Sequence, residues 1–219
     1  GVNSTTGVFS PAASGIGTWT VLYTTMGACG GVDSTDVIVF TAPTTTGIFF
    51  SEYIESGGDK ALEIYNPNDT TVDLSNCFVI RTNNGVTSNP DTFFLNGMLM
   101  PGDVYVISNA SSSTPIQNVS DTTGSASFYN GNDALELWCG GMFMDVIGVP
   151  GVDPGAGGWP VGTGGTEDAT LVRVPTVYVG DASWTGVVEN QWIVYPFTDL
   201  THIGAHLVAT CNVSTGPSA

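Results

Sequence analysis

The chain has 219 residues, with 3 Lys and Arg against 20 Asp and Glu, and a formal net charge of −17. Nucleic-acid binding depends on cationic side chains that displace condensed counterions, so this composition argues against a DNA or RNA partner. No apolar run approaches the roughly 18 residues of a membrane-spanning helix, and an anionic membrane would repel so acidic a chain. We therefore expect no membrane insertion.

The acidic excess has two interpretations. The carboxylates can form a solubilising coat, or some of them can bind Ca²⁺, which prefers oxygen ligands. The sequence contains no EF-hand loop or other acidic repeat, so it defines no set of calcium ligands. We expect no cofactor, with Ca²⁺ as the candidate ion.

The composition favours an all-β fold. Gly and Pro are frequent, with 29 and 12 residues, and no segment shows a sustained 3.6-residue hydrophobic period, so we expect almost no helix. Residues 1–40 predict two or three strands, and a short Pro/Thr-rich linker follows. The predicted division is a partial β segment at 1–43, a β-sandwich at 44–207 and a C-terminal tail or linker at 208–219.

The stretch 49–67 predicts two strands and a turn. A β-rich run at 50–54 is followed by Ser-Gly-Gly-Asp at 56–59, which is turn chemistry. The next run alternates, with Leu62 and Ile64 on one face and Glu63 and Tyr65 on the other.

Later strands show similar pairs of apolar residues two positions apart, which share one face of a strand. Together with the first strands they predict a sandwich of about seven to nine strands. The pairs expected in its core are Leu62/Ile64, Phe78/Ile80, Val104/Val106, Leu135/Leu137, Met144/Val146 and Ile193/Tyr195. Gly140 and Gly141 predict the turn of a hairpin over residues 138–143.

Two long polar loops are expected at residues 108–127 and 148–169. Loops on a rigid sandwich often hold binding residues. Trp159 and Trp184 lie in polar, Gly-rich surroundings. Their rings could stack on a sugar or anchor a neighbouring subunit, or they could cover the small core of their own loop.

No catalytic constellation is apparent. His202 and His206 would lie about 13 Å apart in an extended strand, too far for one metal ion. The carboxylate pairs Glu52/Glu55 and Glu167/Asp168 could in principle form a glycosidase pair, but we expect them to be exposed acids. We therefore predict that the chain is not an enzyme.

Most of the chain, roughly residues 47–206, resembles a lamin-tail-like domain of the kind found in nuclear lamins and in secreted bacterial proteins. After the opening at 49–67, the segments that resemble this family lie at 71–76, 99–107, 131–137, 145–148, 170–173 and 191–196. The resemblance implies an immunoglobulin-like β-sandwich that serves as a structural and interaction module.

The N-terminal part is similar to something else. Residues 6–21, followed by Cys29-Gly30-Gly31 and a strand at 36–40, look like the second half of an immunoglobulin-like repeat in surface adhesins of the Bacteroidetes. We expect the first strands of such a repeat to be absent from this sequence.

The four cysteines fit a disulfide framework in an oxidising compartment. Three pairings are possible. We favour Cys77–Cys139 inside the sandwich, with Cys29–Cys211 joining the N-terminal segment to the tail. Free buried thiols are the alternative.

These resemblances imply an extracellular structural or adhesive module of a cell-surface protein. One alternative is the protomer of an extracellular filament, in which a neighbour completes the N-terminal sheet head to tail by strand addition. Another is the accessory domain of a secreted hydrolase. Expected partners are protein neighbours, either copies of this chain or adjacent repeats, with surface glycans as a further candidate.

Overall fold

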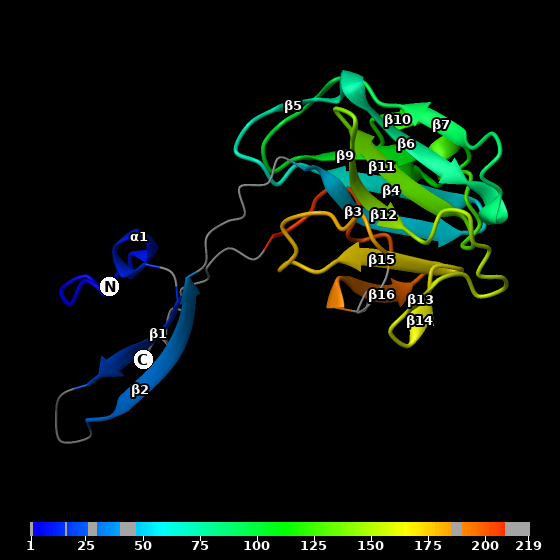
Figure 1. The fold of residues 1–219 in the computed structure, drawn as a ribbon. Coiled ribbons are helices and arrows are strands. Elements are labelled where there is room, and N and C mark those ends of the chain that lie inside the picture. Colours follow the sequence, from blue (N-terminus) through cyan, green and yellow to red (C-terminus); the bar gives the residue numbers. More distant parts are fainter. Residues whose placement is uncertain (1, 16, 26–29, 40–46, 185–189, 209–219) are drawn as a thin grey trace. The chain divides into compact units, whose positions relative to one another are not determined.

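The computed structural model describes residues 2–15, 17–25, 30–39, 47–184 and 190–208 (Figure 1). The chain divides into two compact units, with Gly1–Thr44 and Ala209–Ala219 in the first and Thr45–Val208 in the second.

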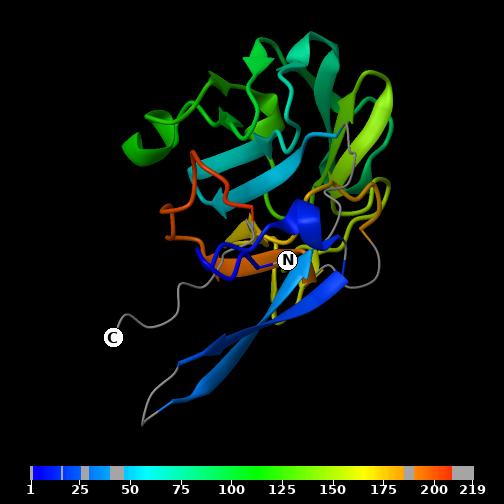
Figure 2. The same cartoon turned by 90° about the vertical axis from the view of Figure 1, so that its left-hand side faces the viewer.

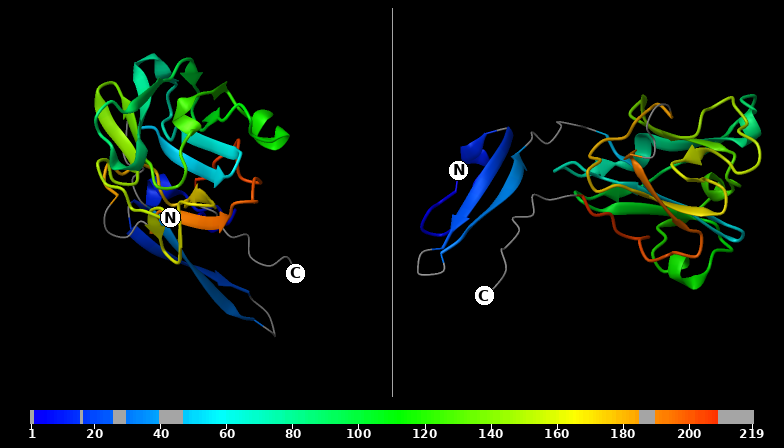
Figure 3. Two further views of the ribbon diagram at one scale, coloured as in Figure 1. Left: turned by 90° about the vertical axis from the view of Figure 1, so that its right-hand side faces the viewer. Right: turned by 90° about the horizontal axis from the view of Figure 1, so that it is seen from below.

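The first unit is a hairpin with a single helical turn. Helix α1 (Pro11–Ser14) precedes β1 (Gly17–Thr24) and β2 (Val32–Val39), which pair antiparallel from Gly17 opposite Val39 to Thr24 opposite Val32. In the described residues this sheet has two strands, and Figure 3 shows the pair without a third strand beside it. Phe9 is the buried hydrophobic side chain of the described part of this unit. A hairpin without a core is marginally stable in water.

The second unit is a β-sandwich of two main sheets (Figures 1 and 2). One has six strands in the order β10-β9-β4-β3-β15-β16, and the other has four in the order β12-β11-β6-β7. Neighbouring strands are antiparallel except β9 and β10. The strands of the first sheet are β3 (Phe49–Ser56), β4 (Asp59–Tyr65), β9 (Val104–Ser108), β10 (Thr122–Thr123), β15 (Ala169–Arg173) and β16 (Trp192–Pro196). Those of the second are β6 (Cys77–Thr82), β7 (Asp91–Phe94), β11 (Ala134–Cys139) and β12 (Met142–Ile147).

The remaining elements are short. Two-residue strands form the pairs β5 (Val72–Asp73) with β8 (Met98–Leu99) and β13 (Pro160–Val161) with β14 (Gly164–Gly165). The helical turns are α2 (Thr114–Gln117), η1 (Leu74–Asn76), η2 (Asn83–Gly85) and η3 (Ser125–Ser127). The predicted all-β immunoglobulin-like sandwich is therefore confirmed, although the two main sheets of the described residues contain ten strands rather than seven to nine.

Both predicted hairpins are present. Gly57 and Gly58 connect β3 to β4. Gly140 and Gly141 connect β11 to β12 with φ values of 58° and 77°, which is the left-handed backbone that a two-residue hairpin turn requires.

The main core lies between the two sheets. Leu62 and Ile64 from β4 meet Leu135 and Leu137 from β11, as predicted. The predicted pairs Phe78/Ile80 and Ile193/Tyr195 were wrong, because the core contains their neighbours instead. In β6 these neighbours are Cys77 and Val79, and in β16 they are Trp192 and Val194. Both strands are apolar at successive positions, so alternation could not determine the buried face.

A second, smaller cluster covers the other face of the six-stranded sheet. Val106, from the predicted pair Val104/Val106, packs there with Ile54, Ala61 and Ile116. Leu200 and Ile203 pack against this cluster from residues 197–206, which we call the covering segment. In β12, Met144 packs against the main core and Val146 is buried, while Ile147 is a member of the main core.

Candidate functional site

A row of four aromatic side chains crosses the outer face of the four-stranded sheet. Phe94 on β7 lies opposite Phe78 on β6, which lies opposite Trp138 on β11, which lies opposite Phe143 on β12. The ring centroids are 5.8, 6.3 and 4.9 Å apart in that order. The ring of Trp138 is within 6° of parallel to Phe78 and 8° to Phe143. We call these four residues the aromatic row.

The facing of β6 and the register of β12 explain why the row forms. Because Cys77 and Val79 point into the core, Phe78 points outward. A bulge between Leu137 and Trp138 shifts the register of β12 and places Phe143 opposite Trp138. The row was missed by sequence reasoning because Phe78 was assigned to the core.

The row is partly open to solvent. Phe94 is 68% exposed, whereas the other three rings are half-buried. In the next line across the sheet, Thr92, Ile80 and Glu136 lie side by side. The carboxylate of Glu136 accepts a hydrogen bond from the indole Nε1 of Trp138 at 3.0 Å. Stacked cross-strand rings stabilise a sheet, but an exposed aromatic edge is also typical of an interaction surface.

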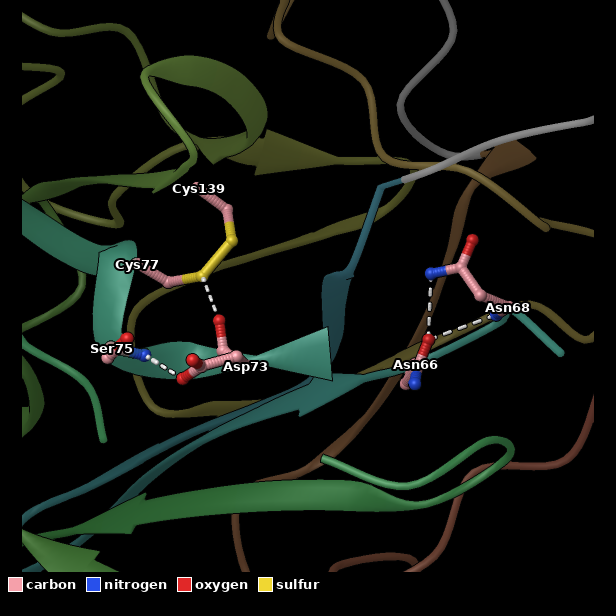
Figure 4. The surroundings of a disulfide bond; sticks show 6 residues. All are labelled: Asn66, Asn68, Asp73, Ser75, Cys77 and Cys139. Carbon is pink, nitrogen blue, oxygen red and sulfur yellow. Dashed lines mark hydrogen bonds between the residues drawn. A yellow bond between two sulfur atoms is a disulfide. The ribbon is translucent and has the colours of Figure 1, made fainter. Parts of the chain in front are cut away.

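A disulfide joins β6 to β11 at one end of the same sheet (Figure 4). Cys77 and Cys139 lie directly opposite each other and are bonded, so the favoured pairing is confirmed. Both residues are buried, and the sulfur of Cys77 lies 3.8 Å from the carbonyl oxygen of Asp73. The Asp73 carboxylate accepts the backbone N–H of Ser75 at 2.9 Å and caps η1. Cys29 and Cys211 lie outside the described residues.

The two candidate tryptophans differ in exposure. Trp159 is only 6% exposed, and its Nε1 lies 3.3 Å from the carbonyl oxygen of Asp133. A Cβ at Gly148 would lie 2.4 Å from that nitrogen, so the ring fills the interior of its own loop. Trp184 is half-buried and packs against the main core. Of the two interpretations of Trp159, the structure favours the one in which the ring covers the small core of its own loop over the one in which it stacks on a sugar.

The two histidines have different surroundings. His202 is partly exposed, with its Nε2 3.8 Å from Asp199. His206 is 8% exposed and packs edge-on against Phe49 and Tyr65, and burial lowers its pKa to about 4. In the described part of the chain, no three His, Cys, Asp or Glu residues are grouped to hold a metal ion. Calcium binding stays a prediction.

The expectation that Glu52 and Glu55 are exposed was wrong, since they are 1% and 5% exposed. Glu52 lies on the face of the six-stranded sheet that the covering segment packs against, whereas Glu55 lies on the opposite face, with Tyr53 of the main core. Glu55 forms an ion pair with Lys60 and accepts the backbone N–H of Asp168 at 2.7 Å. Glu167 and Asp168 are exposed, as predicted.

Glu52 lies opposite Glu63 on neighbouring strands, and both carboxyl groups are buried. Glu63 accepts hydrogen bonds from Ser51 Oγ at 2.6 Å and from the backbone N–H of Gly204 at 2.7 Å. Oε1 of Glu52 is buried without a partner in the described structure. Burial, with the neighbouring acids, raises the pKa of Glu52 to about 9, and burial raises that of Glu63 to about 7. This acidic pair therefore holds a proton at neutral pH and anchors the covering segment through Gly204.

A comparison with protein families identifies the fold. The family model described as Lamin Tail Domain matches residues 41–151, which is just over half of the chain. The chain belongs to the lamin tail domain family. Comparisons with curated proteins and with solved structures found no match. The immunoglobulin-like lamin tail domain is a structural or protein-interaction module, and its fold type is not catalytic.

The aromatic row and the disulfide both lie within the matched part of the lamin tail domain. The resemblance of the N-terminal segment to adhesin repeats falls almost entirely outside the match and stays a prediction. Among the described residues, no helix has the length and apolar character to cross a bilayer.

A buried ion pair links the two sheets of this lamin tail domain. The guanidinium of Arg173 on β15 pairs with Asp145 on β12, and its Nε donates to the carbonyl oxygen of Phe50 at 2.9 Å. It also lies 3.9 Å from the centroid of the Trp192 ring. The Asp145 carboxylate accepts three backbone N–H groups, from Phe50, Val146 and Asp181. Since the acceptors are satisfied, the pair is part of the core framework.

All three Lys and Arg side chains of the sequence are largely shielded from solvent. The side chains of Lys60, Arg81 and Arg173 are 13%, 11% and 1% exposed. Each one pairs with a carboxylate: Glu55, Asp91 and Asp145, respectively. These are the three Lys and Arg residues of the sequence, so the surface charge is almost entirely negative.

Proposed function

We propose that the protein is an extracellular structural and adhesive module of a cell-surface protein, and that it holds a protein neighbour at the aromatic row. The observation that supports this most directly is the exposure of Phe94 at the open end of four aligned rings. Membership of a family of structural and protein-interaction modules also favours a contact with another protein.

Charge strengthens the argument for this face. A second acidic surface would be repelled by most of a chain with a net charge of −17. The row and its neighbouring line contain one ionisable side chain, Glu136, which is hydrogen-bonded to Trp138. Interface centres are depleted in charge and enriched in aromatic residues. The row has both properties.

The disulfide supports an extracellular location. Disulfides such as Cys77–Cys139 persist in oxidising compartments and are rare in the cytosol. The bond lies between buried cysteines on two central strands, away from positions where a redox-active thiol would need to be accessible.

The test places a photo-crosslinking amino acid at Phe94 in the native host, with Phe197 as the matched control. Phe197 is also an exposed phenylalanine, at 44%, but it lies outside the row. We expect a discrete crosslink to a protein from position 94 and none from position 197. We also expect antibodies against the chain to bind intact cells. A chain that antibodies reach only after lysis, or equal crosslinking from both positions, would contradict the proposal.

A second candidate is a filament protomer that assembles by strand addition. Strands β1 and β2 pair only with each other in the described structure, so each has an unpaired edge. Leu22, Tyr23 and Val32 on this hairpin are 68 to 69% exposed. Unpaired edges of this kind are templates for pairing with another chain.

Electron microscopy and light scattering of the purified chain test the filament. Wild type should form regular filaments, and Leu22→Lys should shorten or abolish them, because a lysine on an open edge opposes strand pairing. Lysine at Phe94 is the control, since it lies in the other unit. A monodisperse wild-type chain would rule out self-assembly. The accessory-domain alternative requires a hydrolase domain on the same native polypeptide and is tested by the mass of that polypeptide.

A further inference from the structure

A polar pocket lies in the loop that connects β6 to β7. Its volume is about 400 Å³, within the range of small-molecule sites. Its lining combines three amide side chains, an ion pair and two aliphatic surfaces, contributed by Asn83, Asn84 and Asn89, by Arg81 with Asp91, and by Val86 and Pro90. The three asparagines are exposed, so their amide groups are open to a ligand.

The loop is held in place from behind. Asp133, which is 3% exposed, accepts the backbone N–H of Asn84 at 2.9 Å and lies 3.4 Å from Nη1 of Arg81. Gly85 has a φ of +74°, and a Cβ there would lie 2.8 Å from the backbone of Val152 and Asp153. The loop therefore packs tightly against the segment after β12. A preorganised loop loses less conformational entropy when a ligand binds.

The charge of the pocket selects the class of ligand. One guanidinium, from Arg81, faces two carboxylates, from Asp91 and Asp133. The remaining local charge is negative and the whole chain is strongly acidic, so phosphates and acidic sugars are disfavoured. The guanidinium is already engaged with both carboxylates, which leaves the neutral amides as the main groups available to a ligand.

Amide side chains suit hydroxyl groups. Each amide offers two N–H donors and one carbonyl acceptor in a fixed plane, and each hydroxyl can both donate and accept. Three such amides beside the aliphatic surfaces of Val86 and Pro90 match a ligand with several hydroxyls and a C–H face. We propose that this pocket binds a neutral sugar unit.

The sugar pocket is a different site from the protein contact at the aromatic row. The pocket begins at Arg81 and Asp91, three positions along the strands from the Phe78–Phe94 end of the aromatic row. Loss of sugar binding would leave the crosslink at Phe94 unchanged, and loss of the crosslink would leave the sugar site unchanged.

The test is an NMR titration of the ¹⁵N-labelled full chain with four probes: the methyl glycosides of glucose, galactose, mannose and N-acetylglucosamine. Water competes for every hydrogen bond in an open polar pocket, so we expect a dissociation constant of about 1 mM. At least one probe should produce saturable shifts in amides of residues 81–91. Methyl glucuronide, which has the same ring and a negative charge, should bind more weakly than methyl glucoside.

Asn84→Gly with Asn89→Gly is the decisive variant. Both positions have left-handed backbone, with φ values of 46° and 66°, so glycine removes the amides without strain. We expect binding at least about tenfold weaker, with the spectrum outside the loop unchanged. Asn96→Ala, which removes an exposed amide between β7 and β8, should bind as wild type does. No shift with any neutral probe, unaltered binding by the glycine variant, or tighter binding of the glucuronide would each overturn the proposal.

Discussion

The buried acidic pair makes a quantitative prediction about pH. Glu52→Gln replaces one member of the pair by a neutral side chain of nearly the same shape. The folded-state pKa values of Glu52 and Glu63, about 9 and about 7, lie above the ordinary value of 4.5. Above pH 4.5 the folded chain therefore binds more protons than the unfolded chain, and the free energy of unfolding falls as the pH rises.

The magnitude follows from proton linkage. Each proton that the folded pair retains and the unfolded chain has lost costs about 1.4 kcal/mol of stability per pH unit. For Glu52 this loss extends from about pH 4.5 to about pH 9, and for Glu63 it ends near pH 7. Glutamine at position 52 removes the longer of the two titrations. The free energy of unfolding of the Glu52→Gln variant should exceed that of wild type by a small amount at pH 5 and by about 4 kcal/mol at pH 8.

Urea unfolding at pH 5, 6, 7 and 8, followed by tryptophan fluorescence with EDTA present, measures this difference. Asp69→Asn, which removes an exposed carboxyl after β4, is the control for the loss of one carboxyl group from the chain. A wild-type stability that rises from pH 5 to pH 8, or a Glu52→Gln variant that follows the wild-type curve in parallel, would refute the reasoning. Either result would mean that the pair is ionised when folded.

Three further predictions use the same unfolding assay at pH 7. Arg173→Met leaves the buried Asp145 carboxylate without its cation and should cost about 3 to 5 kcal/mol. Replacing Cys77 and Cys139 by Ala removes a cross-link between residues 62 positions apart and should cost about 4 kcal/mol on the chain-entropy estimate. Tyr129→Phe removes a buried hydroxyl that lies 2.9 and 2.5 Å from the carbonyl oxygens of Ile54 and Ala61, and should cost about 1 to 2 kcal/mol.

Each of these has its own control. Adding Asp145→Asn to Arg173→Met should recover part of the loss, because no charge is then buried alone, and an unchanged loss would contradict the ion-pair argument. Reductant should lower wild-type stability to that of the cysteine variant without affecting the variant. A wild type that is indifferent to reductant would contradict the disulfide. Tyr129→Phe with wild-type stability would show that the hydroxyl makes no net contribution.

The turns of this fold were predictable because their chemistry is local. A β-rich run lies on each side of Gly57-Gly58 and of Gly140-Gly141. Each hairpin is therefore specified by fewer than twenty consecutive residues. The core faces of β4 and β11 were also predicted correctly, because polar residues such as Glu63 and Glu136 alternate with apolar ones there.

The alternation of apolar and polar residues could not identify the buried face of a strand where both faces are apolar. In β6 the successive residues Cys77 to Ile80 are all hydrophobic, and the choice of face depends on the partner sheet. The burial of Glu63 could not be predicted from neighbouring residues either, because the Gly204 backbone N–H that it accepts lies 141 residues away in the sequence. The aromatic row depends on the register of four strands, including one bulge, which the sequence does not reveal.

The covered cations have a practical and a biological consequence. Trypsin-like proteases cleave after Lys or Arg in accessible segments, and the three such side chains of this protein are all at least 87% covered. We expect the folded chain to survive these proteases far better than its loop content suggests. Lysine-directed biotinylation and tryptic shaving of cells would correspondingly overlook it, since Lys60 is the one lysine in the sequence and is paired with Glu55.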